Sequence, residues 1–347
     1  MPEDVAGQHR IRLGEGEPVP CGEDQSLLEA FLRADVWLPH SCTQGSCGTC
    51  KVRVLDGEVD HRDTSEYTLT PEERGAGVAL GCQAAARSDL VVQPLEKADD
   101  DAPKHRLRDV DGTVTALDDI ARDVRRVLVA LDEPLEFSAG QYAEITVPGA
   151  GVARQYSMAN PPSRPDVLEF HVKRTPGGAA TDGWMFRTLA VGERIRLTGP
   201  LGRFGMPDRA GPAILVAGGT GLAPLKSLVE HALQHELAPE LHLYHGGRDR
   251  EDLYDEEFFR DLERTCEQFR YRPCLESGDG GPGEATGLVT DVVLDEFRSC
   301  KGYSGYLCGP PAMVQAGVRA FKRRRMAPKN IHREEFVDAS HEVGDSG

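Results

Sequence analysis

Long apolar runs are absent from this sequence of 347 residues. No stretch approaches the roughly 18 consecutive apolar residues that a membrane-spanning helix needs. The first residues, MPEDVAGQHR, also lack the basic flank and the apolar core of an export signal. We therefore expect a soluble, cytoplasmic protein that makes no membrane contact.

An excess of basic residues is lacking too, because 57 Asp and Glu outnumber 40 Lys and Arg and give a net charge of -17. This charge excludes a nucleic-acid-binding surface, since phosphate groups need cationic partners. Residues 1–97 are the densest in acid, with 17 acidic against nine basic residues. Either this region docks a basic partner, or its charge serves only solubility.

A disulfide framework is not expected, because the nine cysteines are odd in number and no export signal precedes them. Cys42, Cys47 and Cys50 lie in the segment HSCTQGSCGTC, and Cys82 follows after 31 intervening residues. This is the spacing of plant-type [2Fe-2S] ferredoxins. The small loop residues let backbone N–H groups approach the cluster sulfides. A structural zinc, which normally takes paired C-x2-C sequences, and unligated thiols are the alternatives.

The pattern of apolar residues divides the chain into three domains. Residues 1–97 hold short β-type runs around one amphipathic helix, which predicts a small α+β domain. A polar linker is expected over 98–108. Successive strand patterns with Gly and Pro turns over 109–207 predict an antiparallel β-barrel. Alternating strands and helices over 208–336 predict a parallel, doubly wound sheet, and 337–347 form a loose tail.

The barrel region contains the segment RQYS, followed by PGGAATDGW. The Arg154 guanidinium can grip a pyrophosphate, and the Tyr156 ring can stack on a flavin. The glycine-rich loop runs into an expected helix, whose first N–H groups suit a phosphate. The alternative is an exposed arginine and an ordinary barrel tyrosine.

The segment AILVAGGTGLAPLKSL places a glycine-rich turn, Gly218–Gly221, between an apolar strand and a helix that begins near Leu222. Such a turn lets a dinucleotide pyrophosphate approach the backbone, although the G-x-G-x-x-G pattern is only partly met. A tight turn without ligand is the alternative. At the expected tip of the next strand, Arg248 suits a 2′-phosphate, whereas Asp249 suits the ribose of NADH. We favour NADH without excluding NADPH.

Taken together, these segments resemble the ferredoxin-NADP reductase superfamily, and within it the oxygenase reductases with an N-terminal plant-type ferredoxin domain. The similarity covers nearly the whole chain. It implies a β-grasp [2Fe-2S] domain, a barrel that binds FAD and an α/β domain that binds NAD(P). The FAD contacts that it implies are Arg154, Gln155, Tyr156, Ser157, His171, Lys173, Gly178 and Thr181. The NAD(P) contacts that it implies are Gly218, Gly219, Thr220, Gly221, Arg248, Gly309 and Pro310.

The resemblance also implies a set of catalytic residues. Ser157 would lie near the flavin N5 and Cys308 beside the hydride path. Glu334 and Phe336 match the closing E-x-F motif, in which the aromatic ring shields the flavin face. Seen alone, Cys308 in the segment YLCGPPAM would be read as an inert buried thiol.

The implied activity is electron transfer from NADH to an oxygenase. A hydride carries two electrons, whereas a haem or non-haem iron accepts them singly, so FAD and the [2Fe-2S] cluster must split the pair. Segments such as SLLEAFLRADVWLPHSCTQGSCGTCKV and IHREEF are most similar to reductases of cytochrome P450 enzymes that O-demethylate guaiacol. The partner would then be a P450 with a basic proximal face. Alternatives are a Rieske dioxygenase or di-iron hydroxylase as partner, or a non-enzymatic redox-sensing subunit.

Overall fold

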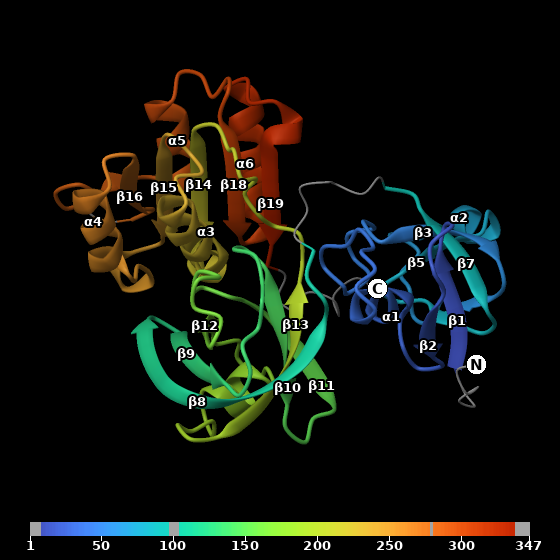
Figure 1. Ribbon diagram of the computed structural model, residues 1–347. Coiled ribbons are helices and arrows are strands. Elements are labelled where there is room, and N and C mark those ends of the chain that lie inside the picture. The colour runs from blue at the N-terminus through green and yellow to red at the C-terminus, as the bar shows by residue number, and fades with distance from the viewer. Residues whose placement is uncertain (1–7, 97–103, 278–279, 337–347) are drawn as a thin grey trace. The chain divides into compact units, whose positions relative to one another are not determined.

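The computed structural model describes residues 8–96, 104–277 and 280–336. The chain forms two compact units, one of Met1–Asp109 with Thr198–Arg203 and one of Val110–Leu197 with Phe204–Gly347. Figure 1 colours both along the chain. Most of the expected linker and the whole expected tail lie outside the described residues.

The first unit is built on a five-stranded sheet with the order β2-β1-β7-β3-β5. Strands β1 and β7 are parallel, and the other neighbours are antiparallel. The helices are α1 and a short α2, and β4 pairs with β6. The strands are β1 (Gln8–Leu13), β2 (Val19–Gly22), β3 (Lys51–Asp56), β4 (Val59–Asp60), β5 (Val78–Leu80), β6 (Ala85–Ala86) and β7 (Leu90–Pro94); the helices are α1 (Leu27–Arg33) and α2 (Pro71–Gly75).

Helix α1 begins where Ser26 accepts a hydrogen bond from the Glu29 N–H at 3.1 Å. Its apolar side chains, including Leu27, Leu28 and Phe31, are buried. A mixed sheet with one buried helix is the β-grasp arrangement that the sequence predicts for this region.

The second unit contains an antiparallel six-stranded sheet with the order β11-β10-β13-β8-β9-β12. Alternate residues such as Val129, Ile145 and Phe170 are fully buried and form the barrel core. A five-residue π-helix, Thr181–Met185, follows β12. The strands are β8 (Arg108–Ala121), β9 (Val124–Leu131), β10 (Tyr142–Val147), β11 (Val152–Ser157), β12 (Val167–Lys173) and β13 (Arg194–Leu201).

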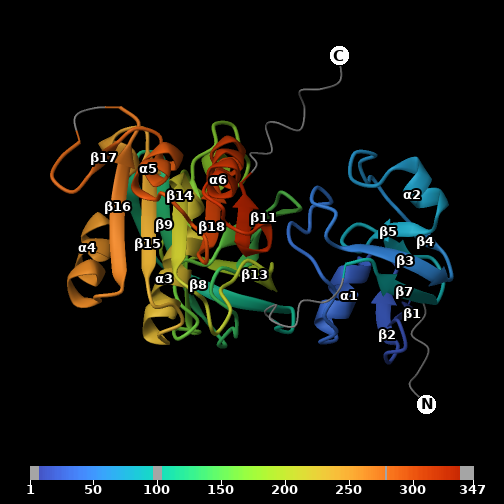
Figure 2. The same cartoon turned by 90° about the horizontal axis from the view of Figure 1, so that it is seen from above.

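The rest of this unit is a parallel sheet with the order β17-β16-β15-β14-β18-β19. Helices α3 and α4 cover one face and α5 and α6 the other, as Figure 2 shows. The strands are β14 (Ala213–Gly218), β15 (Leu241–Gly247), β16 (Phe269–Leu275), β17 (Ala285–Thr286), β18 (Ser304–Gly309) and β19 (Ile331–Glu335); the helices are α3 (Leu222–Gln234), α4 (Glu256–Thr265), α5 (Val289–Glu296) and α6 (Pro311–Arg323). The doubly wound fold predicted from the sequence is confirmed.

The barrel and the parallel sheet share one core. Val124, Ala139 and Phe204 of the barrel region pack in the same apolar cluster as Leu222 and Leu225 of α3. This continuous packing explains why the two domains form a single unit. Within the described ranges, no helix is both long and apolar enough to cross a membrane.

Candidate functional site

The predicted cluster cysteines meet because two strands end side by side. Strand β3 pairs with β5 so that Lys51 lies opposite Leu80. This register brings the residues just outside both strands together, and the Cys82 N–H donates to the Cys50 sulfur at 3.4 Å. Cys50 and Cys82 are buried, whereas Cys47 is exposed.

The loop that carries the other two cysteines turns tightly. Gly45 adopts φ +82°, and a Cβ at this position would lie 3.0 Å from Gln83 Cγ. The Gln83 amide donates to the Cys82 sulfur at 3.6 Å and to the Thr43 carbonyl at 3.1 Å. Gln83 therefore joins the loop to the fourth cysteine.

The four thiols associate in two pairs. Hydrogen bonding with Cys47 is the main cause that lowers the pKa of Cys42 to about 5, and hydrogen bonding with Cys82 is the main cause that lowers the pKa of Cys50. A tetrahedral zinc would draw all four sulfurs to about 3.8 Å from one another. In the described part of the chain, no three cysteine sulfurs lie within 4.8 Å of one another. Two pairs suit two irons, so these residues fit a [2Fe-2S] cluster.

The predicted flavin residues of β11 divide between its two faces, because side chains alternate along a strand. The Tyr156 ring stands edge-on to Phe170, with centroids 6.4 Å apart. Burial raises the pKa of Tyr156 to about 12. Arg154, partly exposed, shares this face, whereas Gln155 donates to Glu144 at 3.0 Å and Ser157 is buried. Arg154 and Tyr156 thus lie on the same face of β11, which is the arrangement that contact with a single ligand requires.

The glycine-rich loop after β12 is closed by its own hydrogen bonds. The Gly178 N–H donates to the Thr175 carbonyl at 2.9 Å, and the Thr175 N–H donates to Thr181 Oγ1 at 3.0 Å. A π-helix starts at Thr181, where the sequence predicts that the loop runs into a helix. The loop and the start of this helix are where the sequence predicts phosphate contacts.

His171 and Lys173 lie on the face of β12 that points away from the barrel core. The His171 ring is buried, with Nε2 2.9 Å from Glu169 Oε1 and Nδ1 3.3 Å from the Tyr254 hydroxyl. Burial lowers the pKa of His171, which keeps it neutral. Lys173 is exposed. Because the His171 ring is already engaged, its predicted FAD contact would have to come from the backbone.

The dinucleotide loop lies against the end of a neighbouring strand. Parallel pairing of β14 with β18 sets Ala217 opposite Cys308. At Gly221, a Cβ would lie 2.2 Å from the Cys308 carbonyl oxygen, so only glycine fits. Helix α3 begins at Leu222, as the sequence predicts, and its N-terminus faces the same edge of the sheet. This close backbone approach is the geometry that a pyrophosphate needs.

Three of the predicted catalytic residues meet at this edge. Parallel pairing of β18 with β19 sets Cys308 opposite Glu334, and the Phe336 N–H donates to the Gly309 carbonyl at 2.9 Å. Cys308 is fully buried. Burial raises the pKa of Glu334 to about 8, and its Oε2 is buried without a hydrogen-bond partner among the described residues. The carboxyl is therefore mostly protonated at neutral pH.

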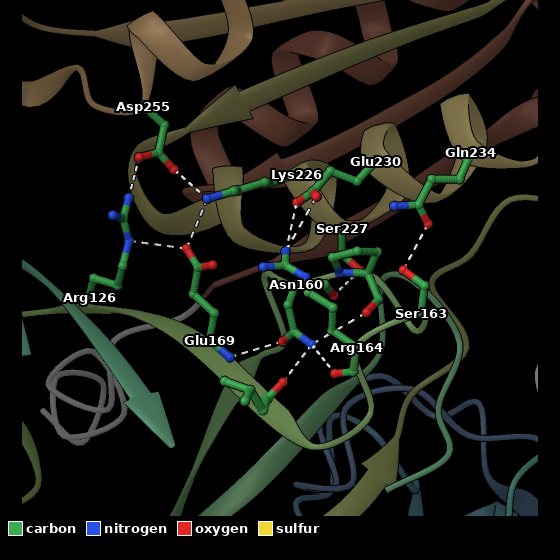
Figure 3. Close-up of polar contacts among 12 residues, drawn as sticks. Arg126, Asn160, Ser163, Arg164, Glu169, Lys226, Ser227, Glu230, Gln234 and Asp255 are labelled. Carbon is green, nitrogen blue, oxygen red and sulfur yellow. Dashed lines mark hydrogen bonds and ion pairs between the residues drawn. The ribbon is translucent and has the colours of Figure 1, made fainter. Parts of the chain in front are cut away.

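A buried charge network joins the barrel to α3, and the sequence analysis missed it. Lys226 Nζ lies 2.9 Å from Glu169 Oε1 and 2.8 Å from Asp255 Oδ2, as Figure 3 shows. Arg126 forms ion pairs with both carboxylates. Glu169, His171 and Asp255 lie close enough to share a metal ion. However, the Lys226 ammonium already occupies the position of a cation.

Direct hydrogen bonds extend this junction along α3. The Ser227 hydroxyl donates to the Asn160 carbonyl at 2.7 Å, and Arg164 pairs with Glu230 (Figure 3). These partners are far apart in sequence, so no local pattern predicts them. The only sequence signal was a lysine on the otherwise apolar side of an amphipathic helix.

Three family profiles match the chain. They are the 2Fe-2S iron-sulfur cluster binding domain over residues 11–87, the oxidoreductase FAD-binding domain over 111–206 and the oxidoreductase NAD-binding domain over 215–319. In this order on one chain, they define an NAD(H)-dependent oxidoreductase that carries FAD and a [2Fe-2S] cluster. The predicted cofactors and fold class are thereby confirmed.

The relatives narrow this class. The reductase subunit of an aromatic O-demethylase from Amycolatopsis sp. is 52% identical over 329 residues, which cover 94% of this chain and 98% of that protein. The reductase component of a phenol 2-monooxygenase from Pseudomonas sp. is 37% identical and covers 95% of both chains. The crystal structure of the Amycolatopsis cytochrome P450 reductase GcoB matches with a TM-score of 0.90 and 50% identity, over 95% of this chain and 99% of that one. The chain belongs to the family of reductase components of oxygenase systems.

Proposed function

We propose that this reductase takes electrons from NADH and passes them singly to a cytochrome P450 that O-demethylates aromatic compounds. The observation that carries the proposal is the 52% identity to the aromatic O-demethylase reductase subunit along almost its whole length. When bound, FAD accepts the hydride and the [2Fe-2S] cluster relays single electrons. The ligands of the cluster are Cys42, Cys47, Cys50 and Cys82.

The residues around the dinucleotide loop bind and orient the substrate. Backbone N–H groups of Gly218–Gly221 receive the pyrophosphate, and Gly309 and Pro310 line the same site. Phe336 would shield the face of a bound flavin, and Cys308 and Ser157 would lie beside the position of hydride transfer. Glu334 holds a proton at its buried carboxyl, which keeps this side of the site uncharged.

The remaining predictions complete the proposal. FAD is held by Arg154, Gln155, Tyr156, Gly178 and Thr181, by the His171 backbone and by Lys173. The domains span 1–97, 109–207 and 208–336, with a linker at 98–108 and a tail at 337–347. We place the protein in the cytoplasm, where its cysteines stay reduced. The acidic residues of 1–97 dock against a basic proximal face of the partner.

Reduction of the haem tests the proposal. The purified protein, mixed anaerobically with NADH, should lose its flavin and cluster absorbance. An aromatic O-demethylating P450 added under carbon monoxide should then develop the absorbance band of its reduced, carbon-monoxide-bound haem. A Rieske ferredoxin and a di-iron hydroxylase serve as competing acceptors. Faster reduction of either would contradict the P450 assignment. A protein that binds NADH but reduces no acceptor, ferricyanide included, would instead support the redox-sensing alternative.

A further inference from the structure

The loop after β15 carries both signs of charge. Ligands of such sheets bind beyond the carboxyl ends of the strands, and a residue at this tip reads the adenosine ribose. Arg248 follows the strand directly, and its side chain is 66% exposed. Asp249, Arg250, Glu251 and Asp252 come next, so three carboxylates and two exposed arginines surround the tip, of which Arg250 pairs with Glu284.

A single residue of the barrel contacts all three carboxylates. Arg122 lies in the turn between β8 and β9, and its Nη2 is 2.5 Å from Asp249 and 2.9 Å from Glu251. Its Nη1 is 3.8 Å from Asp252. The Arg122 backbone N–H also donates to the Glu251 carbonyl at 2.8 Å. The barrel therefore fixes both the backbone and the charge of this loop.

The carboxylate of Asp249 is committed to these contacts. Its Oδ1 accepts hydrogen bonds from Arg122 and from the Glu251 N–H at 3.0 Å. Hydrogen bonding with Arg122 is the main cause that lowers the pKa of Asp249, which stays ionised. Arg248 is held by two other residues: the Ser277 N–H and hydroxyl donate to its carbonyl, at 2.9 and 2.8 Å, and its own N–H donates to Asp252 Oδ2 at 3.1 Å.

We propose that Arg122 is a positioning residue that sets the nucleotide preference of this reductase. It holds Asp249 at the ribose position and offsets the negative charge of the loop, so that a 2′-phosphate is repelled less than the three carboxylates alone would repel it. The inference rests on the proposed function in one respect, namely that adenosine ribose binds at this strand tip.

The charge sets the sign of the effect on the ratio, because a looser loop weakens the binding of both dinucleotides alike. NADPH carries a 2′-phosphate where NADH has a neutral hydroxyl. Removing the Arg122 charge makes the tip more negative, which penalises NADPH more than NADH. Removing the Asp249 charge acts in the opposite direction. One charge within this distance range corresponds to roughly three- to tenfold in the ratio of affinities.

The test compares Arg122→Ala and Asp249→Asn in the protein with its flavin and cluster bound. Dissociation constants of NAD+ and NADP+ are measured by calorimetry, and kcat/KM for NADH and NADPH is measured with ferricyanide. Arg122→Ala should raise the preference for NAD(H) roughly three- to tenfold, and Asp249→Asn should lower it by a similar factor. Arg122→Lys keeps the charge and should retain the ratio, while both KM values rise because the loop loosens.

Arg194→Ala is the matched control, because Arg194 lies on β13 and pairs with Asp132, the residue just after β9. It should leave the ratio unchanged. An unchanged ratio in both Arg122→Ala and Asp249→Asn would overturn the proposal, and so would an equal shift in Arg194→Ala. Failure of the proposed function has a different signature, namely wild-type protein that binds neither NAD+ nor NADP+.

Discussion

At the scale of single residues, Glu334 titrates well above the ordinary range of a carboxyl group. Because burial raises its pKa to about 8, the folded protein keeps a proton that the unfolded chain releases near the ordinary value of 4.5. The stabilising contribution is complete below that ordinary value and declines as the pH rises towards 8. Above 8 it does not change further, since both states are ionised.

Glu334→Gln should remove this dependence, because an amide cannot ionise. Between about pH 5 and pH 9, the thermal midpoint of flavin release should fall less in the variant than in wild type. Hydride transfer to the flavin should lose its alkaline decline near the same pKa. Glu335→Gln on the same strand is the control and should behave like wild type. Superimposable pH profiles of Glu334→Gln and wild type would refute the assignment.

At the scale of elements, the junction between β12 and α3 rests on Lys226. The lysine and both of its carboxylate partners are buried, with side chains less than 10% exposed. Breaking such a network by removing one partner is costly, because the remaining charges stay buried without full compensation. The junction should therefore be intolerant of single neutral substitutions.

Lys226→Met should destabilise the second unit by about 3–5 kcal/mol. The measurement is the urea midpoint of flavin release. Adding Glu169→Gln to this variant should recover part of the loss, since one uncompensated charge disappears. Lys322→Met, at an exposed position of α6, should shift the midpoint little. A Lys226→Met protein as stable as wild type would show that the network contributes nothing.

Short sequence patterns predicted the elements that depend on residues close together in the chain. The cysteine spacing predicted the [2Fe-2S] domain, and the glycine-rich turn predicted the start of α3 at Leu222. Strand β8 has no clear alternating pattern in the sequence, because Asp109, Asp111 and the pair Asp118 and Asp119 interrupt its apolar residues. The eight residues of α5 also escaped notice, since their valines read equally well as a strand.

Contacts between segments that are far apart in the chain could not be predicted from the sequence. Arg122 and Asp249 are separated by more than a hundred residues, as are Arg126 and Asp255. Each of these side chains looks like ordinary surface charge when read along the chain. Only the docking of the barrel on the parallel sheet makes them partners.

At the scale of the whole molecule, the charge balance predicts how the reductase meets its acceptor. Residues 1–97 carry 17 acidic and nine basic residues. If these acids steer a basic partner, the reduction rate of the P450 should fall steeply as salt screens the attraction. Bleaching of the cluster by NADH involves no partner and is the control. If the reduction rate of the P450 does not change with ionic strength, the acidic residues serve solubility and not docking.

The contact of Arg122, in the turn between β8 and β9, with the loop after β15 affects how the domains of such reductases can be exchanged. If preference between the two nicotinamide dinucleotides depends on an arginine of one module and an aspartate of the next, exchanging the dinucleotide-binding module alone would separate the pair. A chimaera built at that boundary would inherit the loop without its counter-ion. The barrel and the dinucleotide-binding domain should therefore be exchanged between reductases as one piece, so that the arginine and the aspartate stay together.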